Sequence, residues 1–304
     1  MPSTNGVDGL RSHPPWVQNA TGSSVVKPTE FDRARVYVVG GSLGIGLAVA
    51  QRVAALGADV TIFARRRDPL AAAAETVRAA CRRATQSVAW RRLDVADPEQ
   101  VAATMHAVVG ERGAPDVLIN CAGRAYPRRF EDVTYAQCAE TMLVNLHGCW
   151  NTVQALLPHM KAKGRGYIVN TSSVAGLIGV FGYTDYCASK FALVGFSEAL
   201  RSELTPYGIT VSVLCPPDTD TPGFATENLT KPAETRAISA TAKVISAAAV
   251  ADELLRGMAR QRFLIIPGRD SRLGVLAHRL VPGVVHRIMD RTVAKVRQRR
   301  VTPR

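Results

Sequence analysis

From residue 34 onward, the sequence alternates short runs rich in Val and Ile with alanine-rich amphipathic stretches. Seven runs have the length and β-branched composition of strands: ARVYVVG, ADVTIFAR, SVAWRRLD, PDVLINCAG, GYIVNTSS, ITVSVLCP and RFLIIPG. Helix-like patterns separate them at residues 45–56, 68–83, 98–112, 135–162, 185–206 and 247–260. Strands that alternate with helices pair in parallel, and helices cover both faces of the sheet. The sequence therefore predicts one α/β domain with a doubly wound parallel sheet of about seven strands.

The N-terminal region differs from this alternating pattern. Residues 1–32 are rich in Ser, Gly, Pro and Asn and contain no apolar signal core, so we expect a flexible extension and not a secretion signal. No stretch approaches about 18 consecutive apolar residues, and no transmembrane helix is expected. The six cysteines form no CxxC pair, which favours reduced thiols in a cytoplasmic protein without a bound metal.

The C-terminal segment, residues 269–304, is strongly basic. It holds ten Lys or Arg residues against Asp270 and Asp290, and so contributes +8 of the formal net charge of +13. It interleaves Leu, Val and Ile with Arg and His, which predicts an amphipathic tail. Such a tail suits the interface of an anionic membrane. It suits equally a helix that packs on the domain or on a partner and ends in a solvated stretch. No nucleic-acid recognition motif accompanies it, so no nucleic-acid partner is expected.

The first strand candidate runs into a glycine-rich turn, VVGGSLGIG, whose glycines have the spacing GxxxGxG. Glycines allow a tight turn and a close approach of the backbone to a pyrophosphate, which the N–H groups of a helix N-terminus can bind. In the first strand–helix unit of a Rossmann-like sheet, such a turn predicts a dinucleotide site. The residues of the turn that we assign to this site are Gly40, Ser42, Leu43, Gly44, Ile45 and Gly46.

The second strand candidate ends in an unusual run of three arginines, Arg65, Arg66 and Arg67. An enzyme that uses NAD usually carries an acid here to bind the ribose 2′-hydroxyl, whereas an arginine can pair with the 2′-phosphate of NADPH. No acid occurs before Asp68. The run therefore favours NADPH, with Arg65 as the expected phosphate ligand and the other two as exposed, solubilising residues.

Acid–base chemistry is expected where a strand ends in two serines and a helix begins near Tyr186. Tyr186 and Lys190 are four residues apart and so share one face of that helix. A phenol titrates near pH ~10 in water, and a neighbouring ammonium would lower its pKa and make Tyr186 a competent general acid and base. Tyr183 is not a candidate, because Cys187 stands four residues after it.

Together these motifs resemble the short-chain dehydrogenase/reductase family over roughly residues 33–268. The GxxxGxG turn, Asp94 after the third strand, the NCAG stretch at 120–123 after the fourth strand, and a YxxxK pair occur in the family's order. Val39 departs from the pattern, which usually has threonine at that place. Because that hydroxyl is mainly structural, the departure concerns local stability more than activity.

The resemblance implies roles for four catalytic residues. Tyr186 would protonate the alkoxide that forms as a hydride reaches a ketone carbon, and Lys190 would bind the nicotinamide ribose and lower the pKa of the tyrosine. Ser173, thirteen residues before the tyrosine, would bind the same oxygen, with Ser172 as the less favoured alternative. Asn145, in MLVNLHG, would position a water for proton resupply. Family members often form dimers or tetramers, so a homo-oligomer is also expected.

The resemblance also implies cofactor contacts beyond the glycine turn. Asp94 and Val95 would flank the adenine, and the stretch Asn120–Gly123, including Ala122, would line the adenosine ribose. The segment CPPDTDTPGF at 215–224 follows the sixth strand, and its prolines exclude helix interior and central strand. In the family this segment covers the nicotinamide, with Pro216 and Thr219 as contacts by position.

The same segment continues as a substrate lid, at about residues 216–246. Its sequence from 216 to 239, and the stretch GVFGYTDYCASKFAL, closely resemble the 3-ketodihydrosphingosine reductases. That resemblance implies NADPH-dependent reduction of 3-ketodihydrosphingosine to dihydrosphingosine in sphingolipid biosynthesis. One alternative is a reductase of another lipid-like ketone, such as a β-ketoacyl thioester or a steroid, and another is a non-catalytic NADPH-binding protein.

Three aspartates in these stretches have no assigned role. Asp185 stands beside the catalytic tyrosine, where that subfamily typically has alanine. Asp218 and Asp220 lie in the lid, and either carboxylate is a candidate to receive the protonated amine of a sphingoid ketone. The alternative is that both lid acids cap turns or a lid helix, as aspartates commonly do.

Overall fold

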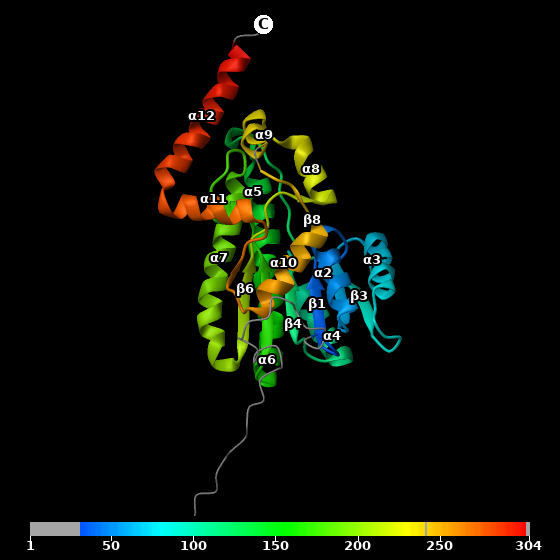
Figure 1. Ribbon diagram of the computed structural model, residues 1–304. Coiled ribbons are helices and arrows are strands. Elements are labelled where there is room, and N and C mark those ends of the chain that lie inside the picture. Colours follow the sequence, from blue (N-terminus) through cyan, green and yellow to red (C-terminus); the bar gives the residue numbers. More distant parts are fainter. Residues whose placement is uncertain (1–30, 241, 302–304) are drawn as a thin grey trace, which may run out of the picture.

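The computed structural model describes residues 31–240 and 242–301 (Figure 1). The predicted N-terminal extension, 1–32, lies outside the described residues except for its last two positions. Phe31 is buried against the core, and Asp32 pairs with Arg83.

Seven parallel strands form the central sheet, in the order β3-β2-β1-β4-β5-β6-β9. They are β1 (Arg35–Val39), β2 (Asp59–Ala64), β3 (Val88–Arg92), β4 (Val117–Asn120), β5 (Gly166–Thr171), β6 (Ile209–Leu214) and β9 (Leu264–Ile265). Each strand lies within one of the seven predicted runs, and the predicted doubly wound sheet is confirmed. The strand order reverses between β1 and β4, where ligands bind at the carboxyl ends of the strands of such a sheet.

Successive residues of each strand face opposite layers of helices, and both layers are buried. In β1, Val36 and Val38 pack into the core cluster of one face, whereas Tyr37 and Val39 pack into that of the other. The first face is covered by α2 (Gly44–Ala55), α3 (Arg67–Ala79) and α10 (Ala247–Ala259). The second is covered by α4 (Pro98–Arg112), α6 (Gly148–Lys163) and α7 (Thr184–Leu204). Burial on both faces explains why the strands read as nearly continuous apolar runs.

The helix predicted over 135–162 is not one regular α-helix. It consists of α5 (Tyr135–Met142), a π-helical turn η3 (Leu143–His147) and α6. A π-helical turn inserts one residue into the helical ladder and often marks a functional site. Short 3₁₀ turns complete this half of the fold: η2 (Phe130–Asp132), η4 (Val174–Gly176) and η5 (Thr205–Tyr207).

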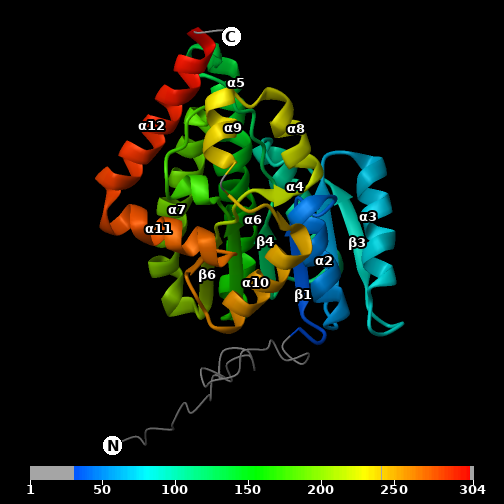
Figure 2. The same ribbon diagram turned by 45° about the horizontal axis from the view of Figure 1, so that its top comes forward.

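The predicted lid folds into its own small unit above the carboxyl edge of the sheet (Figure 2). It contains β7 (Thr219–Asp220), α8 (Pro222–Thr230), α9 (Ala233–Ser239) and β8 (Ile245–Ser246). Strands β7 and β8 pair in parallel as a second, two-stranded sheet. Helix α8 begins with Pro222 and is capped by Thr221, whose hydroxyl accepts a hydrogen bond from Phe224 N at 3.1 Å. Thr221, and not a lid aspartate, therefore caps this helix.

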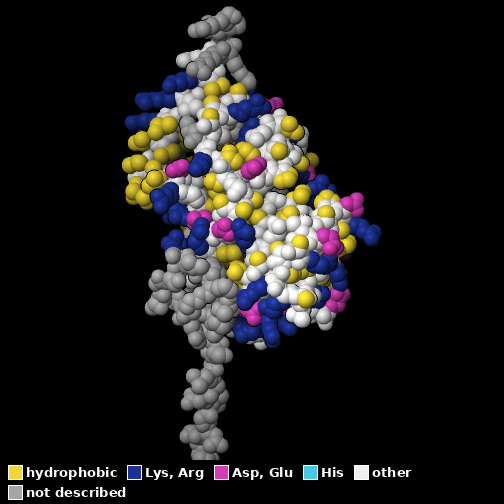
Figure 3. Space-filling model, turned by 45° about the vertical axis from the view of Figure 1, so that its right-hand side comes forward, with side chains coloured by type: hydrophobic (Ala, Val, Ile, Leu, Met, Phe, Trp, Pro, Cys, Tyr) yellow, Lys and Arg dark blue, Asp and Glu magenta, His cyan; other side chains and the backbone are white. Residues whose placement is uncertain are grey.

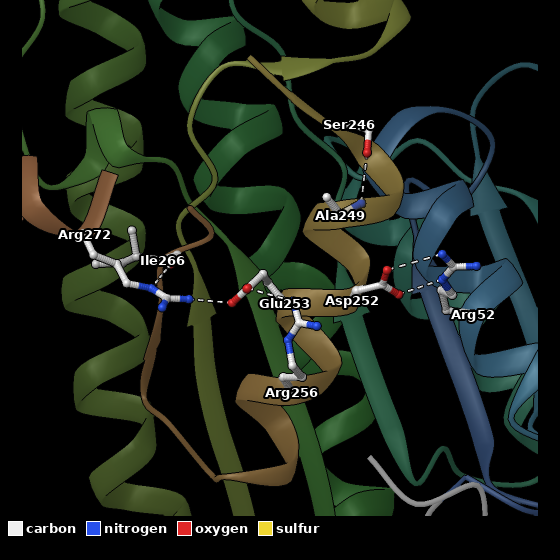
Figure 4. Close-up of polar contacts among 8 residues, drawn as sticks. All are labelled: Arg52, Ser246, Ala249, Asp252, Glu253, Arg256, Ile266 and Arg272. Carbon is white, nitrogen blue, oxygen red and sulfur yellow. Dashed lines mark hydrogen bonds and ion pairs between the residues drawn. The ribbon is translucent and has the colours of Figure 1, made fainter. Parts of the chain in front are cut away.

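The basic segment forms two helices, α11 (Arg269–Leu280) and α12 (Pro282–Val301), and α12 packs against α9 (Figures 1 and 2). Polar contacts anchor α11 to the domain (Figure 4). Arg272 donates to Ile266 O at 2.7 Å and pairs with Glu253 on α10. Asp252, next to it on α10, pairs with Arg52 on α2 at 2.7 Å. Within the described part of the chain, no helix is long and apolar enough to cross a membrane.

Candidate active site

The glycines of the turn between β1 and α2 stand where side chains would not fit. Gly40 has a φ of +81° and Gly44 a φ of +55°, a region that favours glycine. A Cβ on Gly46 would lie 2.2 Å from Gly40 O, and a Cβ on Gly40 would lie 2.4 Å from Ala122 N. The N-cap residue of α2, Leu43, has no side-chain acceptor for the first N–H groups of the helix. These features fit the binding of a pyrophosphate by backbone N–H groups.

A cavity of about 230 Å³ lies beside this turn at the carboxyl ends of β1 and β2. The predicted cofactor residues that line it are Gly40, Ser42, Leu43, Arg65, Val95, Ala122 and Gly123. Arg66, which we expected to be merely solubilising, also lines it, whereas Arg67 lines a different surface hollow. Val144 from the π-helical turn closes the cavity and was not identified from the sequence. Two adjacent guanidinium groups thus stand at the end of β2.

Two residues that we expected to contact the cofactor turn their side chains elsewhere. Asn120 is buried, where its amide donates to Asn170 Oδ1 at 2.9 Å and accepts from Thr152 Oγ1 at 2.9 Å. Asp94 Oδ1 accepts a hydrogen bond from Ala96 N at 3.1 Å, within its own loop. Neither residue lines the cavity. Buried polar groups must be satisfied, and the Asn120 side chain connects β4 to β5 and α6, whereas the Asp94 side chain holds the loop after β3.

The predicted catalytic residues meet beside this cavity. Lys190 is buried, its Nζ donates to Thr171 O at 2.8 Å, and it lies 5.6 Å from the centroid of the Tyr186 ring. The π-helical turn presents Asn145, whose Oδ1 accepts from Arg124 N at 2.8 Å and whose Nδ2 donates to Arg124 O at 3.0 Å. A Cβ on Gly123 would lie 3.4 Å from both Asn145 Oδ1 and Lys190 Nζ. The loop after β4 therefore runs directly past both side chains.

The two serines at the end of β5 have different environments. Ser172 is buried, and its hydroxyl donates to Lys190 O at 2.9 Å. Ser173 lines the same cavity as Tyr186 and forms a hydrogen bond with it. Its Oγ also accepts from Ala175 N at 3.1 Å. Of the two alternatives, the structure brings Ser173 to the tyrosine and uses Ser172 to hold α7.

The surroundings of Tyr186 oppose the expected lowering of its pKa by Lys190. Burial raises the pKa of Tyr186 above its ordinary value, the carboxylate of Glu227 raises it further, and the hydrogen bond with Ser173 lowers it. Burial also lowers the pKa of Lys190. The Lys190 ammonium donates to Thr171 O at the end of β5. With its pKa raised, the phenol stays protonated at neutral pH.

A second cavity, of about 680 Å³, is lined by Tyr186, by the lid and by the start of α11. Pro216 and Thr219, which we expect to contact the nicotinamide, line this cavity, and so does Ile45 from the glycine turn. Most of its wall is apolar, from Val174, Ala175, Ile178, Val180, Pro216, Pro217, Phe224, Ile238, Ala242 and Ile245. Its size is within the range of small-molecule sites. The start of the basic segment, 269–274, contributes to its rim.

The three unassigned aspartates separate in the structure. Asp218 lines the second cavity and pairs with Lys231 at 3.6 Å. Asp220 is exposed on β7 and is not part of the cavity wall. Asp185 is buried and accepts a hydrogen bond from Thr141 Oγ1 at 2.7 Å, which ties α7 to α5.

Sequence reasoning missed two residues of the second cavity, Tyr183 and Glu227. Tyr183 was set aside because no lysine follows it at helical spacing, but it is the N-cap residue of α7 and lies outside the regular helix. Its hydroxyl donates to Glu227 Oε2, from α8, at 3.0 Å. The proximity of Tyr183 to the YxxxK motif was the available signal, whereas nothing in the sequence pointed to Glu227.

Comparison with known proteins agrees with this geometry. The family model described as short chain dehydrogenase matches residues 34–232. The chain belongs to this family. It is 39% identical over 246 residues to the 3-ketodihydrosphingosine reductase of Bos taurus, and 40% identical over 246 residues to the 3-dehydrosphinganine reductase of Danio rerio. In both cases the match covers 81% of this chain and 74% of the relative.

A solved short chain dehydrogenase/reductase from Burkholderia phymatum, in complex with NAD, has a similar fold. Its TM-score is 0.73 at 26% identity, and the match covers 84% of this chain and 95% of that one. As a short-chain dehydrogenase, the chain is an oxidoreductase that uses a nicotinamide cofactor. Among residues 31–240 and 242–301, no group of His, Cys, Asp and Glu is placed to hold a metal ion.

Proposed function

We propose that this oxidoreductase reduces 3-ketodihydrosphingosine to dihydrosphingosine with NADPH. The observation that carries the proposal is the similarity, at 39–40% identity over 246 residues, to reductases named for this reaction. The second cavity supports it, because a mostly apolar wall beside Tyr186 suits a long alkyl chain attached to a ketone.

Four side chains of the protein have separate roles in the proposed reduction. The bound nicotinamide would supply a hydride to the ketone carbon. Tyr186, which is protonated at neutral pH, gives its proton to the developing alkoxide, and Ser173 donates a hydrogen bond to the same oxygen. Lys190 holds the ribose of the cofactor, and Asn145 positions a water that returns a proton to the site.

A comparison of substrates tests the proposed function. NADPH oxidation by the purified protein is measured with 3-ketodihydrosphingosine and, separately, with an acetoacetyl thioester. We expect turnover of the sphingoid ketone and little turnover of the thioester. Turnover of the thioester alone would favour a reductase of another lipid-like ketone. No turnover of either, with NADPH bound, would favour a non-catalytic NADPH-binding protein.

Preference for NADPH is expected to depend on the arginines at the end of β2. We expect Arg65→Ala and Arg66→Ala each to raise the KM for NADPH by about 10-fold or more, because each change removes a charged partner of the 2′-phosphate. The KM for NADH should change by less than about threefold. Arg67→Ala is the matched control, because Arg67 lines a different hollow. Equal effects of Arg65→Ala on the two cofactors would contradict this assignment.

We further propose that the protein is cytoplasmic and contacts anionic membranes peripherally through an apolar ridge on α11 and α12. The ridge consists of exposed side chains, namely Leu273, Leu276, Leu280, Val281, Val284 and Ile288. Figure 3 shows hydrophobic side chains gathered on this part of the molecule, with Lys and Arg beside them. Apolar side chains flanked by cations suit the headgroup region of an anionic bilayer.

Liposome pelleting tests this contact. We expect the double variant Leu276→Glu, Leu280→Glu to lose at least about tenfold of its partitioning onto phosphatidylserine vesicles, because it places two carboxylates on the apolar ridge. Tyr135→Glu is the control, since Tyr135 is exposed but belongs to α5 and not to the ridge residues of α11 and α12. Equal pelleting of the double variant and the wild type would remove the proposal.

A further inference from the structure

The second cavity contains an acid–phenol pair that the proposed chemistry does not use. Tyr183 is buried and donates its hydroxyl proton to Glu227 Oε2 at 3.0 Å. The ring of Tyr183 lies 5.5 Å, between centroids, from the ring of Tyr186. Tyr183 thus contacts both the Glu227 carboxylate and the ring of the catalytic Tyr186.

The surroundings of Glu227 favour a cation as its partner. The wall around it is mostly apolar, and burial raises the pKa of Glu227, whereas Tyr183 and Lys231 lower it. A carboxylate in such a place is costly unless it is hydrogen-bonded or paired. Within the part of the chain that the structure describes, Tyr183 supplies a hydrogen bond to Glu227 and no cationic side chain forms a salt bridge with it.

Asp218, which also lines the cavity, already has a counter-ion, whereas Asp270 lines the cavity from the start of α11. Asp218 pairs with Lys231 at 3.6 Å, and the Lys231 ammonium also lies 4.2 Å from the centroid of the Phe224 ring. Asp220 is exposed and outside the cavity wall. Of the two lid acids that line the cavity, Asp218 and Glu227, Glu227 has no salt bridge among the described residues, so its carboxylate remains for a ligand.

We propose that Glu227, held in place by Tyr183, forms a cation subsite that receives the ammonium group of the substrate. The inference rests on the proposed function and deepens it. In a 2-amino-3-ketone the nitrogen is attached to the carbon next to the carbonyl. It must therefore lie within a few ångströms of the oxygen that Tyr186 protonates, where the Tyr183–Glu227 pair lies. Because Glu227 belongs to α8, an ammonium ion on its carboxylate also holds the lid over the cavity.

Binding of simple long-chain ligands tests the subsite without any turnover. With NADP⁺ present, the full-length protein is titrated with dodecylamine and with dodecanol by isothermal calorimetry. We expect the wild type to bind the amine at least about tenfold more tightly than the alcohol, and Glu227→Gln to lose this preference. Asp218→Asn is the matched control and should keep it. The proposal would be overturned if the wild type showed no preference for the amine over the alcohol. It would also be overturned if Glu227→Gln kept this preference, or if only Asp218→Asn lost it.

A kinetic comparison separates the failure of the subsite from the failure of the proposed function. The ratio of kcat/KM for 3-ketodihydrosphingosine to that for 1-hydroxyoctadecan-3-one, which lacks the amine, should fall about 10- to 100-fold in Glu227→Gln. An unchanged ratio would refute the subsite even if the wild type reduces the sphingoid ketone. An amine preference in the titration, without turnover of that ketone, would retain the subsite and refute the proposed reaction.

Discussion

Tyr186→Phe is expected to reduce kcat for ketone reduction by about 100- to 10 000-fold, which is the usual contribution of a positioned general acid. The substitution removes only the hydroxyl that gives its proton to the alkoxide and leaves the ring in its packing. Ser173, which hydrogen-bonds to the same phenol, cannot replace the proton donor, because an alkyl hydroxyl is a much weaker acid. The measurement is kcat at saturating NADPH, with the cofactor Kd as a check that binding is intact.

The neighbouring phenol provides the control for this prediction. Tyr183→Phe removes a hydroxyl from the same cavity and should lower kcat by less than about tenfold, because Tyr183 holds Glu227 and does not protonate the substrate. Equal losses of kcat in Tyr186→Phe and Tyr183→Phe would contradict the assignment of Tyr186, and not Tyr183, as the proton donor.

The pH dependence of reduction follows from the direction of the Tyr186 shift. Reduction requires the protonated phenol, which is present below its pKa. Because burial raises that pKa above its ordinary value of 10.0, deprotonation of Tyr186 should reduce kcat only above pH 10. A fall in kcat centred between about pH 6 and 8 that disappears in Tyr186→Phe would contradict this.

Gly46→Ala is expected to weaken cofactor binding by about 100-fold and to lower the free energy of unfolding by about 2–3 kcal/mol. The new Cβ would lie 2.2 Å from Gly40 O, which is backbone and cannot rotate away. Gly40 is itself packed closely against the loop after β4, since a Cβ built on it would lie 2.4 Å from Ala122 N, and it therefore has little room to move away. The turn must therefore shift just where the pyrophosphate is expected. Fluorescence titration with NADPH and urea denaturation measure the two effects.

Gly110→Ala is the matched control for this prediction. Gly110 lies within α4, and a Cβ there would meet nothing within 4 Å. Because alanine is the better helix former, the control should stabilise the fold by up to about 1 kcal/mol and leave cofactor affinity intact. Wild-type cofactor affinity in Gly46→Ala would show that the turn is more plastic than its contacts indicate.

The sheet, most of the helices and the position of the candidate site could be predicted from the amino-acid sequence. Each strand is a short apolar run between two helical patterns. Its position can therefore be predicted from residues close to it in the sequence. The glycine turn and the Tyr186–Lys190 pair are likewise short-range features, with spacings that follow from a tight turn and from one face of a helix. Because parallel strands place their carboxyl ends at one edge, these motifs converge there.

Tertiary structure alone decided which side chains face the cavities and what their electrostatics are. Asn120 lies in the expected loop but is turned into the core by Asn170 and Thr152, which lie 50 and 32 residues away in the chain. Burial, which depends on how distant elements pack around the phenol, is the largest influence on the pKa of Tyr186. Glu227 meets Tyr183 across 44 residues because α8 folds over the start of α7. Such contacts depend on how elements that are distant in the sequence pack together, so the spacing of nearby residues does not predict them.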